Sequence, residues 1–118
     1  MNKIMNFEVF KVVFHVDEID KWDRVIANVN NLLKEIDVSN AHIIVIANAQ
    51  AVKGYLMPEK YHAFRNLVQQ NVTLNICHNS MRGLDIQEHQ LPDFVRIVSA
   101  AVMELVRKQH EGFAYIKP

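Results

Sequence analysis

Hydrophobic positions along the chain alternate between short β-branched runs and longer stretches with helical spacing. Strands are predicted for the runs rich in Val and Ile, at Lys11–Val16, Ala41–Ala47, Val72–Cys77, Phe94–Val98 and Phe113–Ile116. Helices are predicted where apolar residues recur every three or four positions, over Ile19–Ile36, Glu59–Gln70 and Ser99–His110, with shorter helical pieces at Val52–Met57 and Asp85–Gln90. Strands that alternate with helices predict a parallel sheet with helices on both faces.

The predicted helices have apolar faces and candidate caps. Asp17 or Asp20 is expected to cap the first helix, and Ser99 is expected to cap the last. Gly112 fits the left-handed position after the last helix. The faces expected to be buried consist of Tyr61, Phe64, Leu67 and Val68 in the Glu59–Gln70 helix, and of Ala101, Val102, Leu105 and Val106 in the last helix.

The strand Val72–Cys77 is the stretch around which the other features are organised. Its apolar residues fall on one side, whereas Thr73, Asn75 and Cys77 fall on the other, because successive side chains of a strand alternate. The strand Ala41–Ala47 is instead almost continuously apolar, as is typical of a strand covered on both faces. A polar row inside such a sheet indicates either a thin cover or contact with another subunit.

The carboxyl ends of parallel strands share one edge, where open α/β sheets bind ligands. His15, Asn48, Cys77 and the loop after Val98 are therefore expected to meet there. Cys77 is the only cysteine and is followed by a predicted loop over His78–Asp85. A thiol near a helix N-terminus or backbone N–H groups has a lowered pKa, and its thiolate is the reactive form.

Cys77 can serve several chemistries with its neighbours His78, Asn79, Ser80, Met81 and Arg82. Asn79 and Ser80 can donate hydrogen bonds to a sulfur anion, and Arg82 can add positive charge. This pattern favours a persulfide carrier and also allows a redox-sensing thiol. Without a second cysteine, dithiol chemistry is disfavoured. The simplest alternative is that Cys77 is a small buried core residue, and Met81 is expected to fill space.

Other histidines and amides are weaker candidates. His15 and His78 are possible bases for a Cys–His hydrolase, but the chain has six histidines, which makes chance pairings common. Asn28 and Asn31 share one face of the first predicted helix. They form either a solvated edge or a buried amide network that holds a loop or a neighbouring subunit.

Composition excludes several classes of function. Lys plus Arg and Asp plus Glu each total 13, so the formal net charge is zero, and no basic field favours nucleic acid or an anionic membrane. No glycine-rich phosphate loop and no His or Cys spacing of a metal site occurs, so neither a cofactor nor a metal is expected. No run reaches the ~18 apolar residues of a membrane span. A soluble cytoplasmic protein is expected, and one cysteine agrees with a reducing compartment.

The chain resembles the DsrE/DsrF/TusD-like sulfur-relay family, and in particular its small single-domain DsrE-family members. The resemblance covers Lys11 to Pro118 and depends on the order and spacing of several segments. These are KVVFHV, NVNNLL with Asn28 and Asn31, IIVIAN, NVTLNICHNSM, and RKQHEGFAYIKP with Gln109, Gly112 and Tyr115.

The resemblance implies one DsrE-like domain over residues 1–118, a three-layer α/β/α sandwich with a mostly parallel five-stranded sheet and flavodoxin-like winding. It also implies a homotrimer or homohexamer. Cys77 would hold sulfane sulfur as a persulfide, received from a sulfur donor protein and passed to an acceptor protein. The turn Asn48–Ala51 lacks the glycines found in many members, so no small-ligand role is expected for it. The alternative function is a non-catalytic oligomeric scaffold or small-ligand-binding module, with Cys77 structural or redox-sensing.

Overall fold

The computed structural model describes residues 8–118, so residues 1–7 of the predicted domain lie outside the described residues. Five strands are present, namely β1 (Phe10–Val16), β2 (Ala41–Ala47), β3 (Val72–Cys77), β4 (Val95–Val98) and β5 (Ala114–Ile116). The α-helices are α1 (Trp22–Leu33), α2 (Tyr61–Gln69), α3 (His78–Gly83) and α4 (Ala101–His110). Short 3-10 helices join them, at Ile19–Lys21, Val38–Asn40, Ala49–Leu56, Pro58–Lys60 and Glu88–Gln90.

All paired strands run parallel, in the order β4-β3-β2-β1-β5. This confirms the predicted fold class, a parallel five-stranded sheet with helices on both faces. The winding differs from the flavodoxin-like order, which is 2-1-3-4-5. Here β1 to β4 follow one another in a single direction across the sheet, and only β5 returns to lie beside β1.

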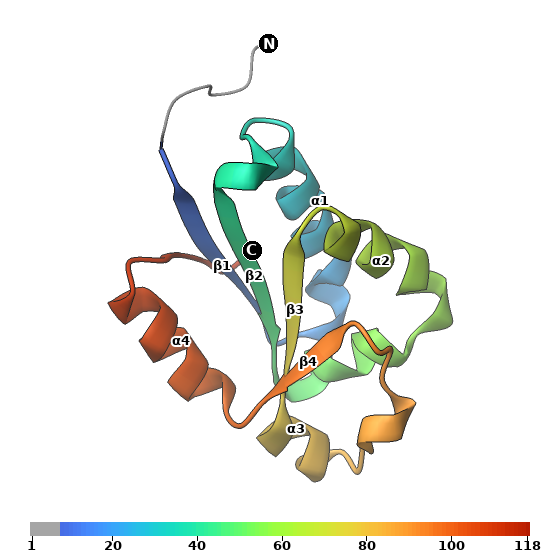
Figure 1. The fold of residues 1–118 in the computed structure, drawn as a ribbon. Coiled ribbons are helices and arrows are strands. Elements are labelled where there is room, and N and C mark those ends of the chain that lie inside the picture. The colour runs from blue at the N-terminus through green and yellow to red at the C-terminus, as the bar shows by residue number, and fades with distance from the viewer. Residues whose placement is uncertain (1–7) are drawn as a thin grey trace.

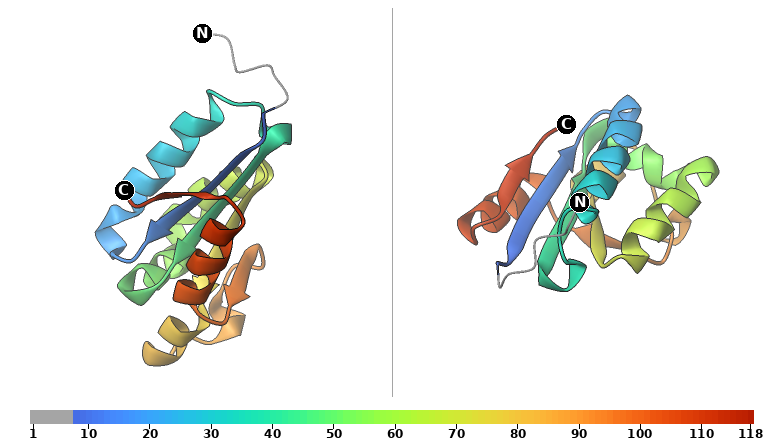
Figure 2. Two further views of the ribbon diagram at one scale, coloured as in Figure 1. Left: turned by 90° about the vertical axis from the view of Figure 1, so that its left-hand side faces the viewer. Right: turned by 90° about the horizontal axis from the view of Figure 1, so that it is seen from above.

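This winding decides which helices cover which face. Right-handed crossovers that step in one direction put their helices on the same face, so α1, α2 and α3 lie together (Figures 1 and 2). The connection from β4 to β5 steps back across the sheet and puts α4 alone on the opposite face. We call this opposite side the α4 face. Its small core consists of Val13, Ile44, Ile46, Cys77, Ala101 and Leu105.

The larger core lies on the other face and is centred on Trp22, which has no exposed surface. Its ring centre lies 5.1 Å from that of Tyr55 and 4.9 Å from that of Phe64. The indole N–H donates to the Ala51 carbonyl oxygen at 2.7 Å. Gly54 gives the ring its space, because a Cβ atom at this residue would lie 2.1 Å from the indole nitrogen.

Two residues predicted to be buried in α4 are instead at the surface. Val102 is 70% exposed and Val106 is 55% exposed, whereas Ala101 and Leu105 are buried as predicted. The helix touches the sheet along a narrow stripe, and no other element of the described chain covers its outer side (Figure 2). The apolar face of α4 is therefore wider than the part of it that packs against the sheet of the same chain.

Several local predictions were also wrong. The segment after Cys77, predicted as a loop, begins with the helix α3. Tyr61, predicted to be buried, is 39% exposed, and its ring centre lies 5.4 Å from that of Phe94 at the margin of the core.

The helix caps also differ from the prediction. Ala100, not Ser99, is the N-cap of α4. The residues in the N-cap positions of the first helical segment are Glu18 and Lys21, so neither Asp17 nor Asp20 has that role. Gly112 has the predicted left-handed conformation, with φ +92°.

Within residues 8–118, no helix is long and apolar enough to cross a membrane. The same residues contain no group of three or more His, Cys, Asp or Glu side chains that could hold a metal ion.

Candidate functional site

Cys77 lies where two elements meet, as the last residue of β3 and the N-cap of α3. Its side chain is on the α4 face, packed with the apolar residues of that core, and the residue is 5% exposed. The polar row of β3 predicted from sequence is on this face as well, with Asn75 also 5% exposed. The single helix α4 covers this row of side chains, which agrees with a thin cover, one of the two alternatives given above.

The winding gives Cys77 a special position among the strand ends. The chain leaves β3 toward α3 on one face, whereas it leaves the neighbouring β4 toward α4 on the other. Adjacent strands whose connections diverge in this way leave a crevice at their carboxyl ends, which is where open α/β sheets bind ligands. Cys77 is paired in register with Val98, the last residue of β4. The thiol is therefore located at the carboxyl ends of these two strands.

Hydrogen-bond donors surround the sulfur. The Ala101 N–H at the start of α4 donates to Cys77 Sγ at 3.4 Å. Burial by itself raises the pKa of the thiol. Hydrogen bonds from the Ala101 N–H, the Ser80 hydroxyl and the N–H groups of Ser80 and Asn79 outweigh burial, so the pKa of Cys77 is below its ordinary value. The starts of two helices thus converge on the sulfur and favour its anionic form.

A set of hydrogen bonds joins the remaining strand ends to this site. His15 Nε2 lies 2.9 Å from Asn48 Oδ1, and His15 Nδ1 lies 2.6 Å from the Tyr115 hydroxyl oxygen. Ala49 follows Asn48 in the chain, and its main-chain N–H donates to Ser80 Oγ at 2.8 Å. Ala49 has the unusual φ of +52° for a residue with a side chain. The predicted meeting of His15, Asn48, Cys77 and the loop after Val98 at one edge is confirmed.

Tyr115 is a residue of this edge that was not among the site residues predicted from sequence. It pairs with Val13 in register, which places both side chains on the α4 face. The alternation of side chains within Phe113–Ile116 indicates which face Tyr115 occupies. Only the position of β5 next to β1 shows that the Tyr115 side chain reaches His15.

The side chains of the other predicted site residues lie farther from the sulfur or point elsewhere. His78 and Asn79 are exposed, and the Arg82 guanidinium donates to the Asn79 side chain at 2.6 Å. Arg82 is therefore held by Asn79 and is not among the groups that lower the thiol pKa. Met81 is buried in the larger core, on the face opposite Cys77. Asn28 and Asn31 are on α1, which covers that same opposite face, with Asn28 half-buried and Asn31 exposed.

The lowered pKa predicts that Cys77 is alkylated at unusually low pH. Iodoacetamide reacts with the thiolate, so its rate constant plotted against pH should have a midpoint below the ordinary thiol pKa of about 8.5. Ser80→Ala removes one donor and should move the midpoint upward. Protein unfolded in urea is the control and should give the ordinary midpoint. Equal midpoints for folded and unfolded protein would contradict the electrostatic account of this site.

No protein-family model matches the chain, and no curated protein sequence matches it. Several solved structures match the chain. The protein of unknown function MTH1491 from Methanobacterium thermoautotrophicum is 31% identical with a TM-score of 0.85, and the match covers 92% of this chain and 99% of that one. The E. coli ychN protein is 18% identical with a TM-score of 0.78, over 93% and 100% of the two chains.

A third structure, the conserved protein of unknown function BT1422 from Bacteroides thetaiotaomicron, is 10% identical with a TM-score of 0.67, over 90% and 94% of the two chains. At these lower identities the E. coli and Bacteroides structures establish a shared fold, which is the YchN-like fold. The similarity to MTH1491 extends to sequence over nearly the full length of both chains. The chain therefore belongs to the same family as MTH1491.

Proposed function

We propose that this protein is a sulfur carrier or sulfurtransferase of the DsrE type, which holds sulfane sulfur as a persulfide on Cys77. The observation that carries the proposal is the thiol itself, because N–H and hydroxyl donors from two helix starts lower its pKa at the carboxyl ends of β3 and β4. The YchN-like fold and the resemblance of the Cys77 segment to the sulfur-relay family support it. The reducing cytoplasm is the compartment in which a lone thiol of this kind stays available.

The reaction needs no external oxidant. The Cys77 thiolate attacks the outer sulfur of a donor persulfide or polysulfide, and a new S–S bond forms on Sγ. The S–S bond of the donor breaks, and its electron pair leaves with the remaining donor sulfur as a thiolate. The N–H groups of Asn79, Ser80 and Ala101 stabilise the anion before the transfer, and an acceptor thiolate or other nucleophile removes the outer sulfur by the same exchange.

The low exposure of Cys77 limits the donor. With 5% of the residue accessible, a small donor such as inorganic polysulfide reaches the sulfur more easily than a bulky reagent. The proposal therefore expects uptake from polysulfide to be faster than labelling by a large maleimide. Transfer to or from a partner protein requires the start of α3 or α4 to yield, since these elements cover the sulfur.

Intact mass measurement tests the proposal. Native protein is incubated with inorganic polysulfide, freed of excess donor and weighed. One added sulfur atom is expected on the wild type and none on Cys77→Ser, which keeps a similar size. Treatment with a reducing thiol should return the original mass. Wild-type protein that gains no sulfur while its fold is intact would reject the proposal.

The low exposure of Cys77 also favours a second candidate function, a non-catalytic scaffold in which the thiol is structural. Under that function the folded protein takes up no sulfur, and Cys77→Ser changes stability only. A redox sensor is distinguished by oxidation of Cys77 with peroxide in the absence of sulfur uptake.

We also propose that the chain assembles into a homotrimer or homohexamer through the outer side of α4. Val102, Met103 and Val106 form an apolar surface there, with exposures of 70%, 46% and 55%. Tyr115 of the exposed strand β5 is on the same face of the sheet and is 40% exposed. A formal net charge of zero offers little repulsion between copies. If this surface is buried against a second copy of the chain, the exposed apolar residues of α4 are explained.

A further inference from the structure

A cavity lies at the opposite end of the α4 face from Cys77. Among residues 8–118, α4 is the only helix on this face, and the amino-terminal ends of the strands extend beyond its last turn (Figure 2). A cavity of about 380 Å³ is found there, within the range of small-molecule sites. Its walls come from the starts of β1, β2 and β3 and from the end of α4. They include Lys11, His42, Asn71, Thr73, Lys108 and Phe113.

Two lysines of this cavity contact the same aromatic ring. Lys11 Nζ on β1 lies 5.9 Å from the centre of the Phe113 ring, and Lys108 Nζ on α4 lies 5.4 Å from the centre of the same ring. Both lysines therefore contact the Phe113 ring, although they come from different elements. The ring attracts each ammonium group through a cation–π interaction.

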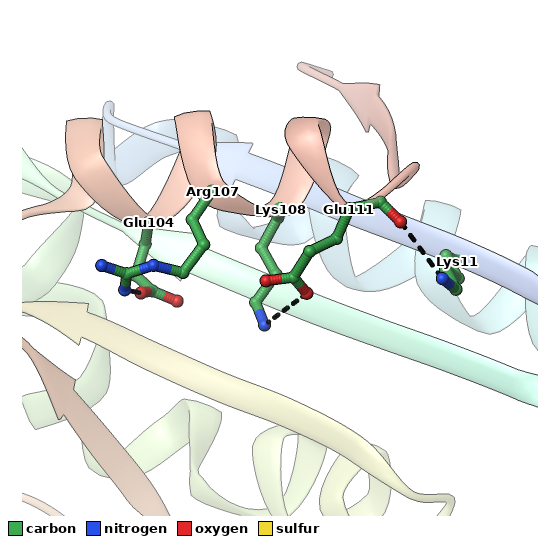
Figure 3. A network of polar contacts seen from close by, with 5 residues as sticks. All are labelled: Lys11, Glu104, Arg107, Lys108 and Glu111. Carbon is green, nitrogen blue, oxygen red and sulfur yellow. Dashed lines mark hydrogen bonds and ion pairs between the residues drawn. The ribbon is translucent and has the colours of Figure 1, made fainter.

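Both lysines contact Glu111, but through different oxygens. Lys11 Nζ donates to the Glu111 main-chain oxygen at 3.1 Å, and Lys108 Nζ lies 3.4 Å from Glu111 Oε1, which is a long contact (Figure 3). Glu104, the other acid of α4 in this view, is paired with Arg107. The described lining residues of the cavity thus include two ammonium groups, those of Lys11 and Lys108, and one carboxylate, that of Glu111. This leaves an excess of positive charge in a chain whose formal net charge is zero.

The remaining walls suit a polar anion. Asn71 and Thr73 add an amide and a hydroxyl that can donate hydrogen bonds. His42 pairs in register with Lys11, so their side chains leave the sheet on the same face. Apolar side chains, Ile44 and Phe113, line the same cavity. Lysine binds phosphate as a point charge without strict geometry, and a dianion would neutralise the two ammonium groups together.

We propose that this cavity, between Lys11, Lys108, Asn71 and Thr73, binds a phosphate group, either as free phosphate or as part of a small phosphorylated metabolite. The phosphate site and the thiol are at opposite ends of the α4 face. The start of α4 donates to Cys77 and its last turn supplies Lys108. The site is independent of the proposed sulfur chemistry.

A titration followed by ¹H–¹⁵N NMR tests the proposal on the full chain. Inorganic phosphate is added against sodium chloride at matched ionic strength. Saturable shifts are expected for the amides of Asn71, Thr73 and Glu111, with little change at Asn79 and Ser80. A parallel titration with a sugar phosphate distinguishes the sources, because tighter binding of the ester indicates a metabolite and equal or weaker binding indicates free phosphate.

Variants connect the shifts to the two lysines. Lys11→Met and Lys108→Met keep the aliphatic stems and remove the charges, and each should weaken phosphate binding by about tenfold or more. Lys53→Met is the matched control, since Lys53 is exposed and outside the cavity, and it should leave binding unchanged. Lys108→Gln replaces Lys108→Met if the latter fails to fold. Shifts that do not saturate, that centre on Cys77, or that persist in a double lysine variant would overturn the proposal.

Discussion

Replacement of Trp22 by alanine is expected to lower the free energy of unfolding by about 3–5 kcal/mol. The ring is fully buried, contacts Tyr55 and Phe64, and donates its N–H to Ala51. Gly54 packs directly against the indole, so removal of the ring leaves a cavity beside the backbone of this residue. A domain of this size has about 5–15 kcal/mol of stability in total, so the variant should be close to unfolding.

Urea unfolding followed by circular dichroism measures this effect, since the variant lacks the only tryptophan of the chain and has no comparable fluorescence signal. Trp22→Phe is the informative control. It keeps an aromatic ring but loses the hydrogen bond to the Ala51 carbonyl, and it should cost less than the alanine variant. A loss below about 1 kcal/mol for Trp22→Ala would mean that the ring is not the centre of the larger core.

The second large effect is expected on assembly. In the double variant Val102→Lys and Val106→Lys, two positive charges replace apolar side chains on each copy, and association would have to bury them unpaired. The variant should therefore sediment as a single chain of 13.7 kDa. The wild type should sediment at three or six times that mass. Both side chains are already exposed in one copy, so its fold should survive the change.

A matched control places the same two charges elsewhere. Asn66→Lys and Gln69→Lys lie on the exposed side of α2, which packs on the opposite face of the sheet. This variant should keep the mass of the wild type. A wild type that stays monomeric at the highest concentration measured, or an α4 double variant of unchanged mass, would exclude self-association through α4.

Helix α4 links the three proposals. Its first N–H donates to the sulfur of Cys77, its last turn supplies Lys108 to the cavity, and its outer side carries Val102 and Val106. A contact that moves α4 along the sheet would change the donors around the thiol and the spacing of the two lysines together. Thiol reactivity measured in the assembled and dissociated forms should therefore differ if the assembly contacts α4.

The amino-acid sequence by itself determined the local elements with strong hydrophobic patterns. The bounds predicted for β2 and β3 are those observed, because continuous and alternating apolar runs depend on residues next to one another. The thiol at the end of β3 and the left-handed conformation at Gly112 follow from equally local signals. The shared edge of His15, Asn48 and Cys77 needed only the additional rule that the strands are parallel.

Only the tertiary structure decided the order of the strands, and several features depend on that order. It puts β5 beside β1, so that Tyr115 reaches His15. It leaves α4 alone on one face, so that Val102 and Val106 are exposed, and it directs Met81 into the larger core and away from the thiol. The cavity between Lys11 and Lys108 joins residues from opposite ends of the chain. The apolar period of a helix marks which side can be buried, but whether another element covers that side depends on contacts between residues far apart in the sequence.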